Sequence, residues 1–247
     1  MDALRRLYRS LVWRSYHRWP LLASELRRWW VRVRHPHVAF RFEGPVYLGP
    51  GFSLHAPDPC TFAVGPGVEF RRGFRCELSK GAEFRVGAGS VFAYNTIVQC
   101  STTIAVGARC AFGQAAMLVD GSHRFRDLDR PMLAQGYDFR PLRIGDDVMV
   151  SAKCTVIADL GDRAFVAANS VVTQPVPAFC LAAGVPATIR DYFGPPGGEP
   201  DELVAAAPSH PLALAVVPED VVHPGLLGGW WFSRPSVPRR TPDEVAR

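Results

Sequence analysis

Aliphatic and aromatic residues return every six positions through the middle of this 247-residue chain. The clearest series are Val86, Phe92, Val98 and Ile104; Val106, Phe112 and Leu118; Ile144, Val150 and Val156; and Leu160, Val166 and Val172. Six residues make about 1.7 helical turns, so this period cannot form one apolar helix face. It is a multiple of the strand period of two. The pattern therefore predicts a β-helix, in which each six-residue unit forms one flat side and three units make one coil.

The positions between the large apolar residues support the same architecture. A small or branched residue follows most of them by four positions, as in Ser90, Thr96, Thr102, Cys110, Ala116, Ser122, Val148, Cys154, Ala164, Ser170 and Val176. Five large residues are followed directly by glycine, at 65, 87, 107, 145 and 161, which suits a sharp corner that leaves no room for a Cβ. Residues 46–177 without the aperiodic stretch 124–141 allow about six coils of ~18 residues. The unit that starts at Val156 is two residues short, which predicts one tightened corner.

Composition shifts divide the chain into three parts. We expect a basic helical segment at 1–37, an all-β domain at 38–193 with an extruded loop at 124–141, and a tail at 194–247. Ten of the 22 prolines lie between Pro195 and Pro242, without a stable apolar period, so the tail is expected to be extended.

The first part combines positive charge with aromatic residues. Nine arginines against Asp2 and Glu25 give residues 1–37 a net charge of +7, so the other 210 residues carry −2 of the total of +5. Apolar residues share one helical face before and after Pro20: Leu4, Leu7, Tyr8 and Leu11, then Leu22, Leu26, Trp29 and Val33. This predicts amphipathic helices, for which two interpretations remain open. Residues 1–34 contact an anionic membrane surface, or their apolar face caps the open end of the β-helix.

Several classes of protein are excluded by what the sequence lacks. No apolar run reaches the ~18 residues of a membrane span, and the first residues do not follow the order of a secretory signal. We therefore expect a cytoplasmic protein, placed on the inner face of the membrane if the membrane interpretation holds. The six cysteines have no metal-ligand spacing, and no basic patch continues into the β domain, so neither a metal nor a nucleic acid is expected.

One histidine stands out as a candidate catalytic group. His123 is the only histidine between residue 56 and the tail, and it lies where the repeat breaks off into the loop 124–141. An imidazole titrates near neutral pH, so at this position it can remove a proton from a hydroxyl or an amine. The alternative is a turn histidine that bonds to the backbone. Long loops that leave a rigid scaffold are where function concentrates, which favours the catalytic interpretation.

Four motifs give the chain a resemblance to a known family. They are Asp120-Gly121-Ser122-His123 before the loop; Pro141-Leu142-Arg143-Ile144-Gly145-Asp146-Asp147-Val148; Ala168-Asn169-Ser170-Val171-Val172-Thr173-Gln174-Pro175-Val176-Pro177; and Ala183-Gly184-Val185-Pro186-Ala187. In this order and spacing they resemble the hexapeptide-repeat acyltransferases, especially the maltose and galactoside O-acetyltransferases and the enzymes that acetylate surface polysaccharides. The resemblance covers Val91–Arg190 strongly and the repeats from residue 46 more loosely.

The resemblance implies a left-handed parallel β-helix, a homotrimer, and acetyl-CoA or another acyl-CoA bound in a groove between two subunits. By the same resemblance His123 is the general base, Asn95 contacts the acceptor, and the backbone N–H of Ala152 stabilises the oxyanion. Asp120 is a further candidate for orienting the acceptor. The positions that match the family's CoA contacts are Met149, Ala152, Ala168, Thr173, Gln174, Thr188 and Arg190.

The chain departs from the family's pattern at several of these positions. Cys100 and Ser101 stand where galactoside-type relatives have an aspartate, and Met149 replaces a larger aromatic residue. Gln174 and Thr188 replace basic residues that help to hold the phosphate groups of CoA, so Arg190, Lys153 or Arg163 would have to supply the charge.

The sequence therefore predicts an acyl-CoA-dependent O-acyltransferase that acts on a glycan or glycolipid by direct transfer. Two alternatives stay open: an N-acetyltransferase of a small amine or antibiotic, and a catalytically inactive trimeric scaffold, which the altered CoA positions favour. A carbonic anhydrase on this scaffold would need three histidines around zinc, and the β-helix region offers one.

Overall fold

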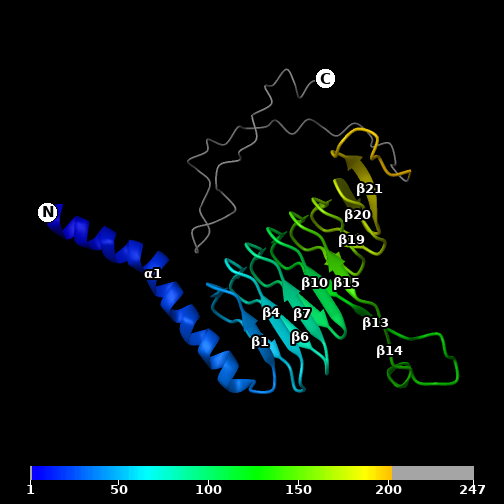
Figure 1. The fold of residues 1–247 in the computed structure, drawn as a ribbon, viewed down its shortest axis with the longest axis horizontal. Coiled ribbons are helices and arrows are strands. Elements are labelled where there is room, and N and C mark those ends of the chain that lie inside the picture. The colour runs from blue at the N-terminus through cyan, green and yellow to red at the C-terminus, as the bar shows by residue number, and fades with distance from the viewer. Residues whose placement is uncertain (1, 202–247) are drawn as a thin grey trace.

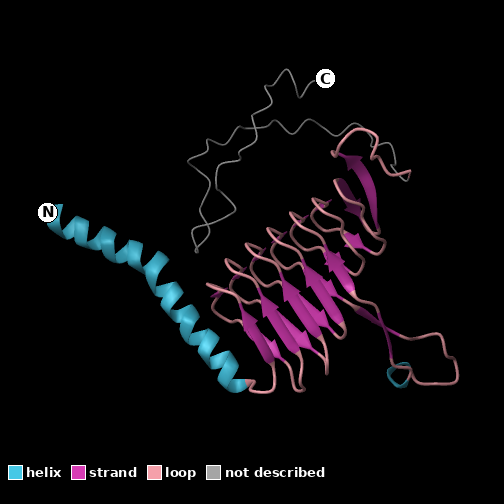
Figure 2. Cartoon of the chain, in the orientation of Figure 1, coloured by secondary structure: helices cyan, strands magenta, loops and turns pink. Residues whose placement is uncertain are grey.

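The computed structural model describes residues 2–201 and shows a left-handed β-helix of three parallel sheets (Figure 1, Figure 2). The first sheet contains, in spatial order, β1 (Ala39–Phe42), β4 (Thr61–Val64), β7 (Glu83–Val86), β10 (Thr103–Val106) and β15 (Leu142–Ile144). The second contains β2 (Tyr47–Leu48), β5 (Glu69–Phe70), β8 (Val91–Phe92), β11 (Ala111–Phe112), β16 (Met149–Val150), β18 (Phe165–Val166), β20 (Cys180–Gly184) and the antiparallel β21 (Ala187–Tyr192).

The third sheet completes the coils. It contains β3 (Ser53–His55), β6 (Arg75–Leu78), β9 (Ile97–Cys100), β12 (Met117–Val119), β17 (Thr155–Val156) and β19 (Val171–Val172). Six stacked strands in this sheet agree with the six coils that the repeat predicts. Outside the three sheets, β13 (Gly121–His123) and β14 (Tyr137–Phe139) form an antiparallel hairpin, which carries the short 3₁₀ helix η1 (Met132–Ala134). Figure 2 shows the hairpin projecting sideways from the column.

The six-residue repeat identifies the interior of the column correctly. Every large apolar residue of the four clearest series is buried, with exposed fractions from 0% to 5%. The small residues four positions later are buried as well, except for Thr102 and Ser122. Ser122 is exposed because the chain has already left the column at Gly121, three residues before the predicted start of the loop.

The coils are not all of equal length, contrary to what a uniform repeat predicts. Ala39 pairs with Thr61 and Thr61 with Glu83, so each of the first two coils is longer than three repeat units. At the far end Ile144 pairs with Leu160 and Leu160 with Val176, so those coils are shorter than three repeat units. The column therefore narrows along its axis, and the shortened unit after Val156 is one place where it does so.

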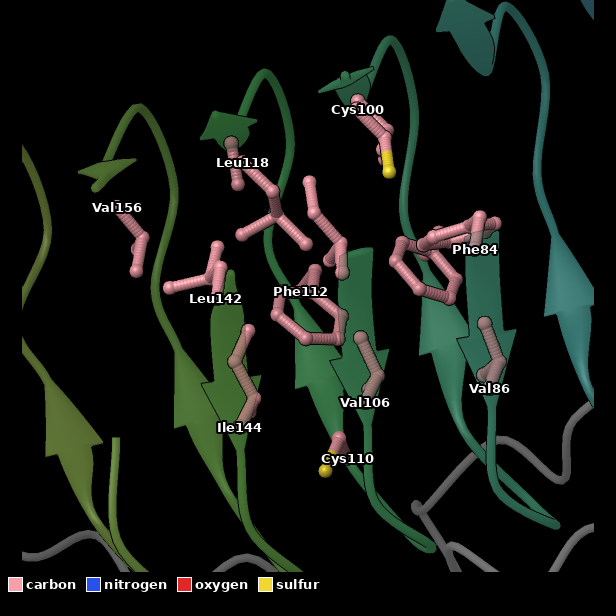
Figure 3. Packing of buried hydrophobic residues seen from close by; sticks show 14 of the residues in the cluster. Phe84, Val86, Cys100, Val106, Cys110, Phe112, Leu118, Leu142, Ile144 and Val156 are labelled. Carbon is pink, nitrogen blue, oxygen red and sulfur yellow. The ribbon is translucent and has the colours of Figure 1, made fainter. Parts of the chain in front are cut away.

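The core residues follow this taper. The wide coils are filled by a chain of stacked and tilted phenylalanine rings, in which Phe92 lies 5.0 Å from Phe70 and 4.6 Å from Phe112 between ring centroids. The narrow coils are filled mainly by valine, as at Val156 and Val166. Figure 3 shows the transition from Phe84 and Phe112 to Leu118, Leu142 and Val156. Interiors pack at nearly constant density, so coil length and side-chain volume must change together.

The glycines of the repeat are required by the stacking of one coil on the next. A Cβ at Gly87 would lie 2.5 Å from the backbone nitrogen of Ala108, and one at Gly161 would lie 2.4 Å from that of Ala178. Both distances are far below van der Waals contact, so the prediction that a Cβ is unwelcome at these corners is confirmed.

Residues 2–34 form one helix, α1 (Asp2–Arg34), rather than the separate helices expected around Pro20. Proline lacks the N–H that would bond the carbonyl four residues earlier, so it bends a helix without always ending it. Figure 1 shows α1 changing direction partway along its length. Within residues 2–201 no helix has the length and apolar character needed to cross a bilayer. The extended tail is expected at residues 194–247, and its part from residue 202 onward lies outside the described residues.

The helix packs on the first coil, but not through the face that the cap interpretation requires. Ser24 and Val31 are buried against the column, whereas Leu22, Leu26 and Trp29 are exposed. The interpretation that the apolar face of α1 caps the column is therefore wrong. The hydrogen bonds between α1 and the backbone around β2 come from the opposite, polar face of the helix.

Candidate functional site

The β13–β14 hairpin carries the predicted catalytic histidine. Its base is closed by a hydrogen bond from the Arg140 amide to the Asp120 carbonyl, at 2.8 Å. Gly121 leaves room for the ring of Phe139 across the hairpin, since a Cβ there would lie 2.4 Å from that ring. An ion pair of 2.6 Å joins Arg124 to Asp138. These local contacts hold the hairpin in place where it leaves the column.

His123 lies at the end of β13, directly opposite Tyr137 on β14. The two rings contact each other with centroids 4.3 Å apart and planes inclined at 44°. The histidine is exposed, and neither of its ring nitrogens bonds to another residue within the part of the chain that the structure describes. The alternative of a turn histidine tied to the backbone is therefore not what the structure shows. Both nitrogens remain available to an incoming group.

Two cavities share His123 and Ser122. One, of about 390 Å³, lies between the hairpin and the outer face of the third sheet, and includes Glu77, Gln99 and Tyr137 in its wall. The other, of about 430 Å³, lies within the loop and is lined by Arg124, Phe125, Arg126, Asp127, Arg130, Gln135 and Asp138 besides the two shared residues. The histidine thus stands between two spaces of the size that small ligands occupy.

Asp120 is buried and already engaged, with an exposed fraction of 3%. One carboxylate oxygen accepts the amide of Ser101 at 2.8 Å, and the other accepts the amide and hydroxyl of Thr102 at 2.6 and 2.8 Å. Asp120 therefore ties the turn between β9 and β10 to the root of the hairpin. Its predicted catalytic role remains a prediction, and these bonds describe a residue that positions the hairpin.

Cys100 does not take over the role of the aspartate that the galactoside-type resemblance leads us to expect in this region. Its side chain lies in the core, and burial, aided by the nearby charge of Asp120, raises the pKa of the thiol to about 12. At neutral pH it is an uncharged thiol, so it can neither orient an acceptor by charge nor act as a thiolate nucleophile.

The other predicted residues lie on different edges of the column. Asn95, Ala152 and Ala168 occupy the corner between the second and third sheets, where the Asn169 amide bonds the Ala152 carbonyl at 3.0 Å. His123 and Asp120 lie at the opposite end of the third sheet, as do Thr173 and Gln174 after β19. A strand of four residues, about 13 Å, separates the two edges. Met149 lies on β16, and Thr188 and Arg190 are exposed on β21.

This arrangement does not bring Asn95 to His123 within one chain. The cavity beside His123 is lined instead by Glu77 and Gln99, whose side chains bond each other at 3.2 Å. Gln99 on β9 pairs with Val119 on β12, and Glu77 on β6 pairs with Gln99, so the three residues occupy the same position in successive coils. The repeat itself contained this signal, because outward-facing residues stack in register from coil to coil. Neither residue is among the predicted site residues, because the family resemblance points to an asparagine as the contact of the acceptor.

The amide of Ala152 is free to act as a donor. The neighbouring amides of Ser151 and Lys153 bond the carbonyls of Val166 and Gln114. For the N–H of Ala152, by contrast, residues 2–201 provide no acceptor. An unpaired backbone donor at an exposed corner fits the predicted oxyanion role, which stays a prediction.

No cluster of three or more histidine, cysteine or acidic side chains that could hold a metal ion occurs in the described residues. The remaining five buried cysteines pack as thiols in the core, like Cys100.

Comparison with known proteins finds curated relatives and similar folds. No family model matches the chain. The probable acetyltransferase Rv3034c of Mycobacterium tuberculosis is 27% identical over 191 residues, which are 73% of this chain; the chain spans 61% of that protein's length. The N-acyltransferase AntD from Bacillus cereus has a TM-score of 0.54 at 13% identity, over 65% of this chain and 86% of that one. The hexapeptide-repeat acetyltransferase VCA0836 from Vibrio cholerae O1 biovar eltor has a TM-score of 0.48 at 22% identity, over 69% and 79%.

The likeness to AntD confirms the fold, and the similarity to Rv3034c agrees with the predicted resemblance to hexapeptide-repeat acetyltransferases. They do not identify the maltose and galactoside branch within that family.

Proposed function

We propose that this chain, similar as it is to hexapeptide-repeat acetyltransferases, is an acyl-CoA-dependent O-acyltransferase with a sugar hydroxyl of a glycan or glycolipid as acceptor. The observation that carries the proposal is the placement of His123. Its ring stands on the hairpin between two cavities, is contacted by Tyr137, and has both nitrogens free of partners in the described chain. A base in this position can reach an acceptor in either cavity.

The reaction would proceed by direct transfer. An unprotonated ring nitrogen of His123 takes the hydroxyl proton while the acceptor oxygen attacks the thioester carbonyl. The tetrahedral intermediate carries its negative charge near the N–H of Ala152. Collapse breaks the carbon–sulfur bond, and the proton on the imidazole passes to the leaving thiolate, which departs as CoA. The histidine returns to its starting state without a metal or a redox step.

Two edges of the column have to meet for this chemistry, and in one chain they lie about 13 Å apart. A site between two copies resolves this distance, because the edge with His123 on one copy can face the edge with Asn95, Ala152 and Ala168 on the next. We therefore propose a homotrimer, the closed assembly that the family resemblance implies. In such an assembly Asn95 of one copy keeps its predicted role in the same site as His123 of the next.

The wall of the smaller cavity suggests further acceptor contacts. Glu77 and Gln99 present a carboxylate and an amide beside His123, and Ser79 and Ser101 add hydroxyl groups bonded to each other at 3.1 Å. Carboxylate, amide and hydroxyl groups are suited to bind several hydroxyls of a sugar. In this proposal Glu77 supplies the negative charge that Cys100 does not.

Acetyl-CoA is the proposed acyl donor. The curated relative Rv3034c is described as a probable acetyltransferase, and the AntD structure was obtained with dTDP and 3-hydroxybutyryl-CoA. In this chain Met149, Thr173, Gln174, Thr188 and Arg190 are the proposed contacts of the cofactor. Gln174 and Thr188 are uncharged and cannot neutralise the phosphate groups of the cofactor. The proposed partners of these phosphates are the exposed cations Arg190, Lys153 and Arg163.

An amine acceptor is the second candidate function. AntD is described as an N-acyltransferase and was crystallised with dTDP. The same histidine can deprotonate an attacking ammonium group, so the chemistry of the base does not separate the two acceptors. Parallel assays with hydroxyl and amino sugars do.

The proposal is tested by titrating the purified protein calorimetrically with acetyl-CoA and with dephospho-CoA. Slow thioester hydrolysis is followed in parallel for the wild type and for His123→Ala. We expect micromolar binding of acetyl-CoA, and hydrolysis that falls on the order of 10²–10⁴-fold in the variant. Leu128→Ala, an exposed residue of the same hairpin loop that lines neither cavity, is the matched control. Absence of binding at millimolar acetyl-CoA would contradict the proposal and favour the inactive scaffold.

A further inference from the structure

The helix α1 is attached to the column by its polar side. The hydroxyl of Ser24 accepts the Leu48 amide at 2.8 Å and donates to the Val46 carbonyl at 3.4 Å. The guanidinium of Arg27 donates to the Leu48 carbonyl at 2.6 Å. Arg28 and Arg32 lie over the ring of Phe42, at 5.2 and 4.8 Å from its centroid. The backbone around β2 is thus bonded to one face of the helix, which fixes the rotation of α1 about its own axis.

The opposite side of α1 is an exposed apolar stripe. Its members lie on one helical face, with Trp30 beside them, and all are between 51% and 69% exposed: Tyr8, Leu11, Trp19, Leu22, Leu26, Trp29, Trp30 and Val33. From Tyr8 to Val33 the stripe is about 37 Å long at 1.5 Å per residue. Large apolar side chains exposed on one helical face at both ends of such a length mark a surface that binds something.

Charge complementarity indicates what covers this stripe. Residues 1–37 carry a net charge of +7, whereas the rest of the chain is slightly negative. Bringing two or three such helices together would bring their like charges together as well. An anionic lipid surface instead offers phosphate groups for the arginines and acyl chains for the apolar residues. Paired tryptophans such as Trp29 and Trp30, with ring centroids 6.3 Å apart, are suited to the level of the headgroups.

We propose that α1 lies in the surface of an anionic lipid bilayer, with the stripe from Tyr8 to Val33 inserted and the column held on its aqueous side. The geometry permits this orientation, because the N-terminal half of α1 extends away from the column in Figure 1. The bonds of Ser24 and Arg27 then keep the β-helix on the side of α1 that faces away from the lipid. The inference does not depend on the acyltransferase activity.

The test is co-sedimentation of the full-length protein with two kinds of vesicle, one of phosphatidylcholine alone and one that also contains the anionic lipid phosphatidylglycerol. The double variant Leu26→Glu, Trp29→Glu changes two exposed residues of the stripe and leaves the contacts with β2 intact. Leu128→Glu, Leu133→Glu is the matched control, because it makes the same change at exposed apolar residues of the hairpin loop. Light scattering of each protein in the absence of lipid measures its oligomeric mass.

We expect the wild type and the control to sediment with anionic vesicles and to be released by high salt, because salt screens the attraction of arginine to lipid phosphates. The stripe variant should bind at least tenfold more weakly at an unchanged oligomeric mass. Failure of the wild type to bind, or equal binding by the stripe variant, would overturn the proposal. A stripe variant whose oligomeric mass falls while vesicle binding is unchanged would identify a second copy of the chain as the occupant.

Discussion

The column and the hairpin that leaves it are stabilised by different kinds of contact. In the column, Phe92 is fully buried between two other phenylalanine rings, and every strand pairs with the coil before or after it. In the hairpin, β13 and β14 pair only with each other, and His123, Tyr137 and Phe139 are exposed. The column is therefore specified by packing, whereas the hairpin is held by a few local contacts and is free to present side chains. Substitutions in the first region should alter stability, and substitutions in the second should alter turnover.

The largest effect on stability is expected at the centre of the wide coils. Phe92→Ala removes a ring that stacks on Phe70 and Phe112, and the rigid coils above and below cannot close the cavity. The free energy of unfolding should fall by about 3–5 kcal/mol. Denaturation by urea, followed by circular dichroism, measures this change. A loss below about 1 kcal/mol would mean that the column is loosely packed, and the contrast with the hairpin would disappear.

A smaller loss is expected where the two regions join. Asp120→Asn keeps the shape of the side chain but replaces one carboxylate oxygen by an NH₂ group. That group cannot accept the hydrogen bond from the Ser101 or Thr102 amide that faces it. Bonds to a charged group contribute roughly 1.5–3 kcal/mol, so the free energy of unfolding should fall by about 2 kcal/mol. The same denaturation experiment decides the point. Unchanged stability together with lost turnover would assign Asp120 to the chemistry instead of to the positioning of the hairpin.

On the hairpin itself, Tyr137→Ala should separate activity from stability. The substitution removes the ring that contacts His123 at 4.3 Å, so the imidazole is less well oriented and turnover should fall about tenfold. Tyr137 is half exposed, so the free energy of unfolding should change by no more than ~0.5 kcal/mol. Tyr137→Phe keeps the ring and should retain turnover. A stability loss as large as that of Phe92→Ala would contradict the distinction between the two regions.

The smallest effect concerns an ion pair on the outside of the column. The Arg109 guanidinium binds Asp147 through two hydrogen bonds of 2.7 and 2.8 Å, which lower the pKa of that carboxyl below its usual 3.8. The pair therefore stabilises the folded state above pH 3.8, and this contribution is lost as the pH falls through the lowered pKa. Both side chains are more than a third exposed, so Asp147→Asn should cost at most ~1 kcal/mol at pH 7.

Unfolding of the wild type and of Asp147→Asn, measured between pH 2 and pH 7, checks the sign of this effect. The difference between the two proteins should shrink toward pH 2. A difference that grows on acidification would mean that the ion pair does not act in the folded state as the structure indicates.

The column could largely be predicted from the sequence, whereas the structure of the hairpin could not. The six-residue repeat predicted the core, because an inward position such as Val98 or Ile104 is constrained by the coil that contains it. The repeat also placed the extruded loop, but not the pairing of β13 with β14, because that pairing depends on local contacts such as Phe139 over Gly121. The taper from long coils to short ones is not predicted by the repeat, because a constant six-residue period implies coils of equal length.

The orientation of α1 on the column could not be predicted from the sequence pattern either. An amphipathic pattern predicts that one face is apolar, but not which face meets the rest of the protein. Here the backbone groups of Val46 and Leu48 select the polar face, through Ser24 and Arg27. The place of Glu77 and Gln99 beside His123 could not be predicted from the sequence, because it depends on the register of the stacked coils and on the position of the hairpin.

The central claim is that His123 acts across a boundary between two copies of the chain. It is tested by co-expressing two inactive variants and measuring turnover of the mixed assemblies. His123→Ala removes the base, and Ala168→Trp fills the opposite edge at an exposed position. Each variant alone should be inactive, and equal mixing in a trimer should restore about a quarter of wild-type turnover, because every mixed trimer contains one intact site. Turnover no higher than that of the separate variants would contradict the claim.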